Sequence, residues 1–224
     1  MILLENGPFK LLFTDKTLSL SWKTDEPEKV KENWLRVKRL LGIPQLKIAY
    51  LSQVHASTIK TVTDYGFQGW GDGLISSEEG IALVIFTADC IPILFYEEDS
   101  QLFGALHCGW KPLASGLIEN LLEKVRLSGI NPKKLKIYLG PGINSCCYRV
   151  GKDLAEQFKG YERFFTARNG SLYCHLKGII KEKLKRQTER IYDINICTKC
   201  SGHYFSHRKG DRERQIGLIV KLPK

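Results

Sequence analysis

The chain has 224 residues, of which 43% are hydrophobic and 26% charged, and these are the proportions of a water-soluble globular protein. Its net charge of +10 favours anionic partners such as phosphate and nucleotides, although a solvated basic exterior is the simpler explanation. The N-terminus lacks the basic and apolar regions of a signal peptide, and the most apolar run, residues 81–96, is shorter than the roughly 20 residues of a membrane helix. We therefore expect one cytoplasmic domain over residues 1–224, no membrane association, and seven cysteines that are mostly reduced or act as ligands.

Apolar patterning divides the chain into alternating strands and helices. Strands are predicted at 9–22, 46–52, 58–62, 74–76, 80–87, 91–96, 101–107, 135–139, 192–197 and 216–221. Helices are predicted at 24–42, 113–127, 152–159 and 175–190. The first helix has a Thr or Asp cap before Pro27, buries Trp34 in the core and stops at Gly42. Loops are predicted at the glycine-rich residues 66–73 and the polar residues 198–214.

Three metal-binding side chains, His55, Cys90 and His107, stand at the ends of predicted strands. Two histidines and one cysteine with an open fourth position form a known catalytic zinc arrangement. Blue copper uses the same three ligands but needs a weak axial ligand such as methionine, and the only methionine is Met1. The ligands are 35 and 17 residues apart, unlike a compact zinc finger, so spacing alone leaves unrelated structural residues as an equal alternative.

Two further cysteine motifs have a weaker metal signal. The Cys197-x-x-Cys200 motif, followed by His203 and His207, offers ligands for a structural zinc, but the spacing is tighter than in the common finger. The motif also ends a strand instead of opening a helix, so we favour no metal and no redox role there. The adjacent pair Cys146-Cys147 is interpreted as packing, because neighbouring cysteines rarely bridge each other.

Four positions are candidates for binding phosphate or another anionic part of a substrate. Lys111 lies beside a predicted helix start, where free backbone N–H groups favour anions. Arg208 and Lys209 belong to the basic loop, and Gly140 opens a tight turn that lets a ligand approach the backbone. The alternative is an exposed basic loop with no ligand.

Several stretches share a specific pattern: SQVH (52–55), GDGLI (71–75), TADCIPILFY (87–96), GALHCGW (104–110), LGPGINSCCYRVG (139–151), FSHRKG (205–210) and RQIGLI (214–219). This pattern resembles the laccase-domain family, once described as multicopper polyphenol oxidases and later as purine nucleoside phosphorylases. The resemblance implies an α/β (α+β) fold, a layered αββα-type sandwich with mixed sheets. It also implies zinc on His55, Cys90 and His107. Lys111-Pro112 and Arg149 depart from the family pattern.

The resemblance implies one zinc-dependent enzyme with two activities. As a transferase (a purine nucleoside phosphorylase), it cleaves adenosine, inosine, guanosine and methylthioadenosine with phosphate. As a hydrolase (an adenosine deaminase), it deaminates adenosine. Asp89 is the carboxylate nearest in sequence that can move protons. One alternative is a cysteine hydrolase with Cys90 as nucleophile and His107 as base. A copper-dependent polyphenol oxidase is not favoured, because a multicopper centre needs many imidazoles and the chain has five histidines. No nucleic-acid-binding motif accompanies the charge, and the oligomeric state is open.

Overall fold

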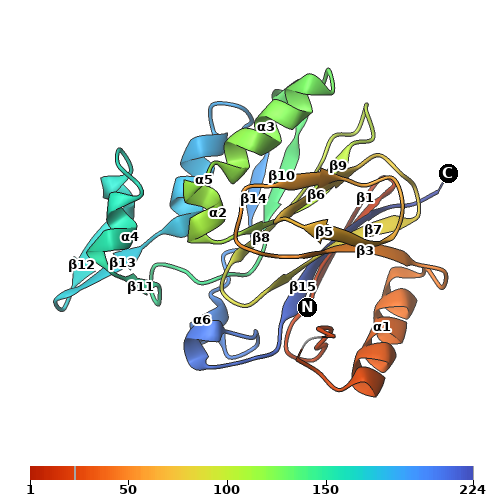
Figure 1. The fold of residues 1–224 in the computed structure, drawn as a ribbon, viewed down its shortest axis with the longest axis horizontal. Coiled ribbons are helices and arrows are strands. Elements are labelled where there is room, and N and C mark those ends of the chain that lie inside the picture. The colour runs from red at the N-terminus through yellow and green to blue at the C-terminus, as the bar shows by residue number, and fades with distance from the viewer. Residues whose placement is uncertain (23, 224) are drawn as a thin grey trace.

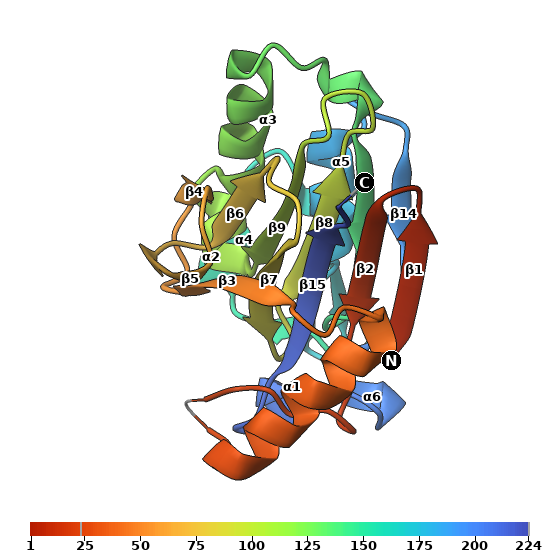
Figure 2. The same cartoon turned by 90° about the vertical axis from the view of Figure 1, so that its right-hand side faces the viewer.

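The computed structural model describes residues 1–22 and 24–223, which form two stacked six-stranded sheets with helices on both outer sides (Figures 1 and 2). The first sheet has the order β1 (Ile2–Asn6), β2 (Phe9–Phe13), β15 (Gln215–Lys221), β7 (Ile81–Thr87), β3 (Lys47–Ser52) and β5 (Gly66–Trp70). The second has the order β14 (Ile191–Asp193), β10 (Lys136–Leu139), β8 (Ile91–Tyr96), β9 (Phe103–Cys108), β6 (Gly73–Ser76) and β4 (Ile59–Thr61). Each sheet combines parallel and antiparallel pairs.

The helices lie at the outer sides of the sandwich and at its end. They are α1 (Pro27–Leu41), α2 (Trp110–Ala114), α3 (Leu117–Leu127), α4 (Lys152–Glu156), α5 (Leu176–Leu184) and α6 (Thr198–Ser201). A small sheet of β11 (Arg149–Val150), β13 (Ser171–Cys174) and β12 (Phe165–Arg168) projects beside α4 (Figure 1).

Alternation along the strands explains the layers. In β7, Leu83 and Ile85 belong to the core between the sheets, whereas Val84 packs with Trp34 of α1 on the outside. In β8, Phe95 packs in the other outer core, which also holds the apolar faces of α3 and α5. Because successive strand residues point to opposite faces, a single strand contributes side chains both to the core between the sheets and to an outer core. The αββα sandwich with mixed sheets is therefore confirmed.

Several predicted elements differ from the structure. β1 precedes the predicted first strand, and residues 14–22 form no strand. α1 is capped by Glu26 without a side-chain bond, because the Asp25 carboxylate accepts from Ser19 and Ser21 instead. The predicted helix 113–127 is two helices, since Gly116 takes the left-handed φ of +89° between α2 and α3.

The glycine-rich segment 66–73 was wrongly predicted as a loop. Residues 66–70 form β5, which pairs in parallel with the end of β3 at the edge of the first sheet. The pairing is irregular between Tyr50 and Ser52, and Gly69 has a φ of +82°, so glycine here marks a bulged edge strand.

Strand register brings distant residues together at one end of the sandwich. The start of β8 pairs antiparallel with the end of β9, where Ile91 faces Cys108 and Pro92 faces His107. The start of β6 lies beside the same end of β9, with Gly73 opposite Leu106. Residues that just precede β8 and β6 therefore reach His107.

Candidate metal centre and cavity

His55, Cys90 and His107 meet at this end of the sandwich. Their ligand atoms all lie within 4.8 Å of one another, and Cys90 Sγ is 4.0 Å from His55 Nε2. The two imidazole rings are 4.9 Å apart and nearly perpendicular. His55 is exposed, Cys90 half-buried and His107 buried, so the group is open to solvent at His55. Two imidazoles and a thiol are a donor set that suits Zn²⁺, and the residues fit such an ion.

Asp72 holds both histidines in place. Its side chain is fully buried, and Oδ1 accepts a hydrogen bond from His107 Nδ1 at 2.7 Å. Oδ2 accepts from the backbone N–H groups of Val54 and Ala56, on either side of His55. The bond to Nδ1 leaves Nε2 of His107 for a metal, and a carboxylate behind a histidine ligand fixes its tautomer and orientation.

The backbone around the centre is strained and tightly packed. His55 and Asp89, neither of them glycine, have φ values of +58° and +89°. The side-chain amide of Gln53 holds the approach to His55, because it donates to Phe86 O at 2.8 Å and accepts from Phe86 N at 2.7 Å. A Cβ on Gly109 would lie 2.7 Å from Cys90 Sγ, so only glycine fits there.

The electrostatics favour a thiolate beside an imidazolium when no metal is bound. Burial alone would raise the pKa of Cys90, but attraction to the His107 cation and hydrogen bonds from both histidines lower it to about 6. Burial would lower the pKa of His107, but the Cys90 thiolate and Asp72 raise it to about 9. Burial also opposes ionisation of Asp72, yet the bonds from His107 and Ala56 bring its pKa below the usual value.

A cavity of about 920 Å³ opens in front of the three residues. One wall is aromatic and partly exposed, with Trp22, Tyr50, Phe67, Trp70 and Phe86. The rest of the lining includes Trp110, Lys111, Tyr148, His207, Arg208 and Arg214. A site with an apolar wall and a few cations matches a planar ligand that also has an anionic group.

The predicted substrate residues divide between this cavity and other places. Lys111 and Arg208 line the cavity, and the Arg208 guanidinium lies 5.0 Å from the Tyr148 ring. Lys209 is exposed and is not among the lining residues. Gly140 is also absent from the lining, because its α-carbon packs against Phe13, where a Cβ would lie 2.3 Å from the ring.

Asp89 lines the cavity, but both of its carboxylate oxygens are hydrogen-bonded to the C-terminal segment. Oδ1 accepts from Thr198 Oγ1 at 2.6 Å, and Oδ2 accepts from the Arg208 backbone N–H at 2.8 Å. This geometry favours Asp89 as the anchor that positions Arg208.

The sequence prediction missed Asp72 and the aromatic wall. Asp72 lies 35 residues before His107, and its only sequence signal was the GDGLI stretch. From their spacing, Cys197 and Cys200 were considered together with His203 and His207, but in the structure they lie with Cys146 and Cys147. Of the adjacent pair, Cys147 packs against the core, whereas Cys146 is exposed.

Fold and site together define a class: αββα proteins with a histidine–cysteine–histidine group at one end of the sandwich. Within that class, the chain belongs to the multi-copper polyphenol oxidoreductase laccase family, which matches residues 7–222. Two relatives are named purine nucleoside phosphorylase. The one from Borreliella burgdorferi is 32% identical, over 95% of this chain and 92% of the relative. The one from Deinococcus radiodurans is 30% identical, over 92% of this chain and 83% of the relative.

Crystal structures of similar proteins have the same fold. The hypothetical protein YfiH of Bacillus licheniformis has a TM-score of 0.89 and 25% identity, covering 97% of this chain and 94% of that protein. YlmD of Geobacillus stearothermophilus has a TM-score of 0.87 and 25% identity, covering 96% and 92%. Among the described residues, none of the helices has the length and apolar character needed to span a membrane.

Proposed function

We propose that this protein is a zinc-dependent purine nucleoside phosphorylase, in which residues 1–224 form one catalytic domain that works in the cytoplasm. The observation that carries the proposal is the juxtaposition of His55, Cys90 and His107 with a cavity that has an aromatic wall and a cationic side. The names of the relatives give the reaction, and the donor set favours zinc over copper.

The aromatic wall supplies a binding surface for a purine base. Trp22 and Tyr50 have ring centroids 5.4 Å apart, and Tyr50 and Phe67 are 5.8 Å apart, so the rings form a continuous surface. Trp70, which is 70% exposed, extends it toward solvent. Purine bases stack on such rings, and each contact is worth about 1–3 kcal/mol.

Arg208 and Lys111 supply the charge for phosphate. The Arg208 side chain is exposed to the cavity, and it is held by a 2.7 Å bond from Nη1 to the carbonyl of Arg149. Lys111 Nζ lies 5.6 Å from the centre of the Trp110 ring. A fixed guanidinium with remaining N–H donors binds phosphate oxygens in a defined orientation. We assign no phosphate contact to Lys209 or Gly140.

In the proposed reaction, a phosphate oxygen forms a bond to ribose C1′ while the bond from C1′ to the purine nitrogen breaks. The electron pair leaves with the base, which takes up a proton. Bound zinc would supply positive charge next to the reacting groups. The residues of the chain hold the two substrates in line, stack the base on the aromatic wall, and orient His107 through Asp72. Adenosine, inosine, guanosine and methylthioadenosine are the proposed nucleosides.

Deamination of adenosine is the proposed side activity, in which water adds at C6 of the base and ammonia leaves. That reaction needs a group to move protons, and Asp89 or His107 is the proposed carrier. Asp89→Asn tests this assignment, because it would reduce phosphorolysis alone if Asp89 only positions Arg208 for phosphate, and both activities if Asp89 also moves protons in deamination.

A cysteine hydrolase is the second candidate, and one observation favours it. Cys90, His107 and Asp72 lie in the order of a nucleophile, base and orienting carboxylate. The family's description instead names a multicopper oxidase, but the chain has only five histidines, of which His55 and His107 alone join a candidate ligand group in the described part.

Metal analysis and product analysis on the same purified protein test these functions. We expect zinc in the protein, and free purine base released only when phosphate is present. Cys90→Ala should lose the ion at this centre and the activity while keeping its circular dichroism spectrum, whereas the matched variant Cys174→Ala should keep both. A Cys90→Ala protein that has lost the ion at this centre and still releases base would overturn the proposal. Metal-free protein that hydrolyses esters or amides until Cys90 is alkylated would favour the hydrolase.

A further inference from the structure

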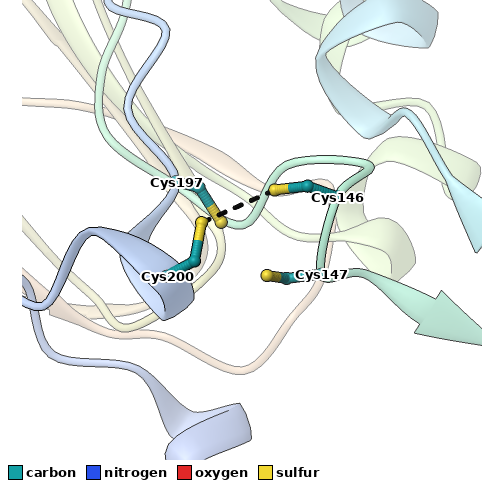
Figure 3. Close-up of side chains that lie close together, drawn as sticks. All are labelled: Cys146, Cys147, Cys197 and Cys200. Atoms are coloured by element: carbon teal, nitrogen blue, oxygen red, sulfur yellow. Dashed lines mark hydrogen bonds between the residues drawn. The ribbon is translucent and has the colours of Figure 1, made fainter.

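A second group of metal-binding side chains lies outside the cavity. The sulfur atoms of Cys146, Cys147, Cys197 and Cys200 all lie within 4.8 Å of one another, and those of Cys146 and Cys200 are 3.7 Å apart. Figure 3 shows the four sulfur atoms directed toward one another, two from each segment. In a tetrahedral site with zinc–sulfur bonds of about 2.3 Å, the sulfurs lie about 3.8 Å from each other. All four cysteines are free thiols, and the spacing is that of ligands around one ion.

The two segments are aligned by their backbones before any ion is bound. Gly142 N donates to Ile196 O at 3.2 Å, and Thr198 N donates to Gly142 O at 3.1 Å. The Asn144 side chain donates to Asn195 Oδ1 at 2.9 Å. These bonds continue the parallel pairing of β10 with β14, which fixes the Cys146-Cys147 pair opposite the Cys197-x-x-Cys200 motif. Four ligands from two paired segments need little further ordering to bind.

The surroundings suit a site with negative charge. The backbone N–H of Asn144 points to Cys197 Sγ at 3.5 Å, and such bonds stabilise thiolate ligands. Four thiolates and one divalent cation have a net charge of −2. Arg149, Lys199 and Arg208 line the shallow depression beside Cys146 and Cys147, so cations are present to balance this charge. Soft thiolate ligands in a tetrahedral group select zinc over magnesium or calcium.

We propose that Cys146, Cys147, Cys197 and Cys200 bind one structural Zn²⁺ ion in a closed tetrahedral site, separate from the His55–Cys90–His107 centre. Binding releases the thiol protons to solvent and leaves no open position for a substrate. The ion cross-links the turn after β10 to the start of α6, two segments that are 54 residues apart at Cys146 and Cys200.

This cross-link also supports the cavity. Tyr148 follows Cys147 directly, and Thr198, between the other two ligands, bonds to Asp89. Asp89 in turn holds the backbone of Arg208. The ion therefore fixes the wall that carries Arg208 and Tyr148. This consequence for phosphate binding rests on the proposed function, whereas the presence of the ion does not.

Counting zinc atoms per chain tests the site without an activity assay. We expect two zinc ions in the wild type, one in Cys200→Ala, one in Cys90→Ala and none in the double variant. Cys200 is exposed, so its loss leaves the core intact, and the matched variant Cys174→Ala should keep two. X-ray absorption of the zinc in Cys90→Ala should show four sulfur neighbours at about 2.3 Å.

Three results would overturn the proposal. The first is unchanged zinc content in Cys200→Ala, and the second is nitrogen among the zinc neighbours in Cys90→Ala. The third is a disulfide among the four cysteines, found by peptide mass spectrometry in protein purified without reductant. If the zinc counts hold but no nucleoside is cleaved, the proposed function fails and the structural site stands.

Discussion

At the residue scale, Asp72 influences the ionisation of Cys90 indirectly, through the His107 ring that lies between them. Asp72 binds His107 Nδ1 and so stabilises the imidazolium, and the imidazolium stabilises the Cys90 thiolate. In the metal-loaded protein the same bond directs His107 toward the ion. One carboxylate therefore prepares the group both for zinc and, without zinc, for nucleophilic attack.

This pairing predicts the alkylation of Cys90 in the metal-free protein. Because the pKa of Cys90 is lowered to about 6, its thiolate forms as the pH rises through that value. The rate of iodoacetamide labelling, followed on the Cys90 peptide by mass spectrometry, should rise between about pH 5 and 7 and then level off. An ordinary thiol has its midpoint near pH 8.5.

Asp72→Asn is the control, because it removes the charge that holds the proton on His107. The labelling midpoint should move upward in that variant, and the zinc affinity measured by chelator competition should fall by about 10–100-fold. An unchanged midpoint would show that Asp72 does not set the ionisation of Cys90.

At the scale of elements, the contact between the end of β9 and the start of α2 sets the space for the metal centre. Gly109→Ala places a methyl group 2.7 Å from Cys90 Sγ, between β9 and α2. We expect the variant to lose the zinc at this centre and its activity with a small change in melting temperature. Gly129→Ala is the matched change, since it has open space around it and a φ of +74°. It should cost about 1–2 kcal/mol of stability and keep the zinc.

The edge strand β5 carries the outer part of the aromatic wall, and Trp70 tests its role. The side chain is 70% exposed, so Trp70→Ala should leave the stability and zinc content unchanged. Loss of one stacking contact, about 1–3 kcal/mol, should raise the KM for the nucleoside about 5–150-fold with little effect on the KM for phosphate. Leu127→Ala, at an equally exposed apolar residue on α3, should change neither constant. Equal changes in both KM values would contradict base stacking at Trp70.

Helices and strands with strong apolar patterns were predictable from the sequence. Elements whose structure depends on pairing with another strand, or on the conformation of a single glycine, were not. The spacing of Val30, Trp34 and Val37 locates α1, and the continuous run 81–87 locates β7. β5 could not be predicted, because its glycines have no side chains to form a pattern and its strand character comes from pairing with β3. The break at Gly116 was also hidden, since glycine within an apolar pattern is compatible with a continuous helix.

At the scale of the whole molecule, the ligand groups depend on strand order, which the sequence contains only indirectly. His55, Cys90 and His107 were identified as candidates because each lies at the end of a predicted strand-like segment and because the family resemblance selects them. Asp72 and the four-cysteine group were not found, because their members meet only through the pairing of β6 with β9 and β10 with β14. Residue type identified candidate ligands, and topology decided which of them meet.

Stability toward acid is also a property of the whole molecule. The ion pairs of Asp193 allow us to predict how the free energy of unfolding changes as the pH falls. This carboxylate joins β14 to α5, with Lys177 Nζ at 2.8 Å and Lys181 Nζ at 2.7 Å, and the Lys177 side chain is 1% exposed. Burial raises the pKa of Asp193, but the bonds from the two lysines outweigh it and bring the pKa below the ordinary aspartate value. The folded state therefore binds this proton more weakly than the unfolded chain. The stabilisation is complete above about pH 4 and is lost as the pH falls through the folded pKa.

Asp193→Asn should consequently lower the free energy of unfolding at pH 7, measured with urea, by about 3–5 kcal/mol, because it leaves the buried Lys177 ammonium without its carboxylate partner. The difference from the wild type should shrink as the pH falls from about 4 through the lowered folded pKa, because the wild-type carboxylate is then protonated in the folded state as well. Asp99→Asn, which removes an ion pair between exposed side chains, should match the wild type at every pH. If the difference in the free energy of unfolding between Asp193→Asn and the wild type stays constant from pH 7 to pH 3, the stabilisation comes from packing and neutral hydrogen bonds and not from the charge of Asp193.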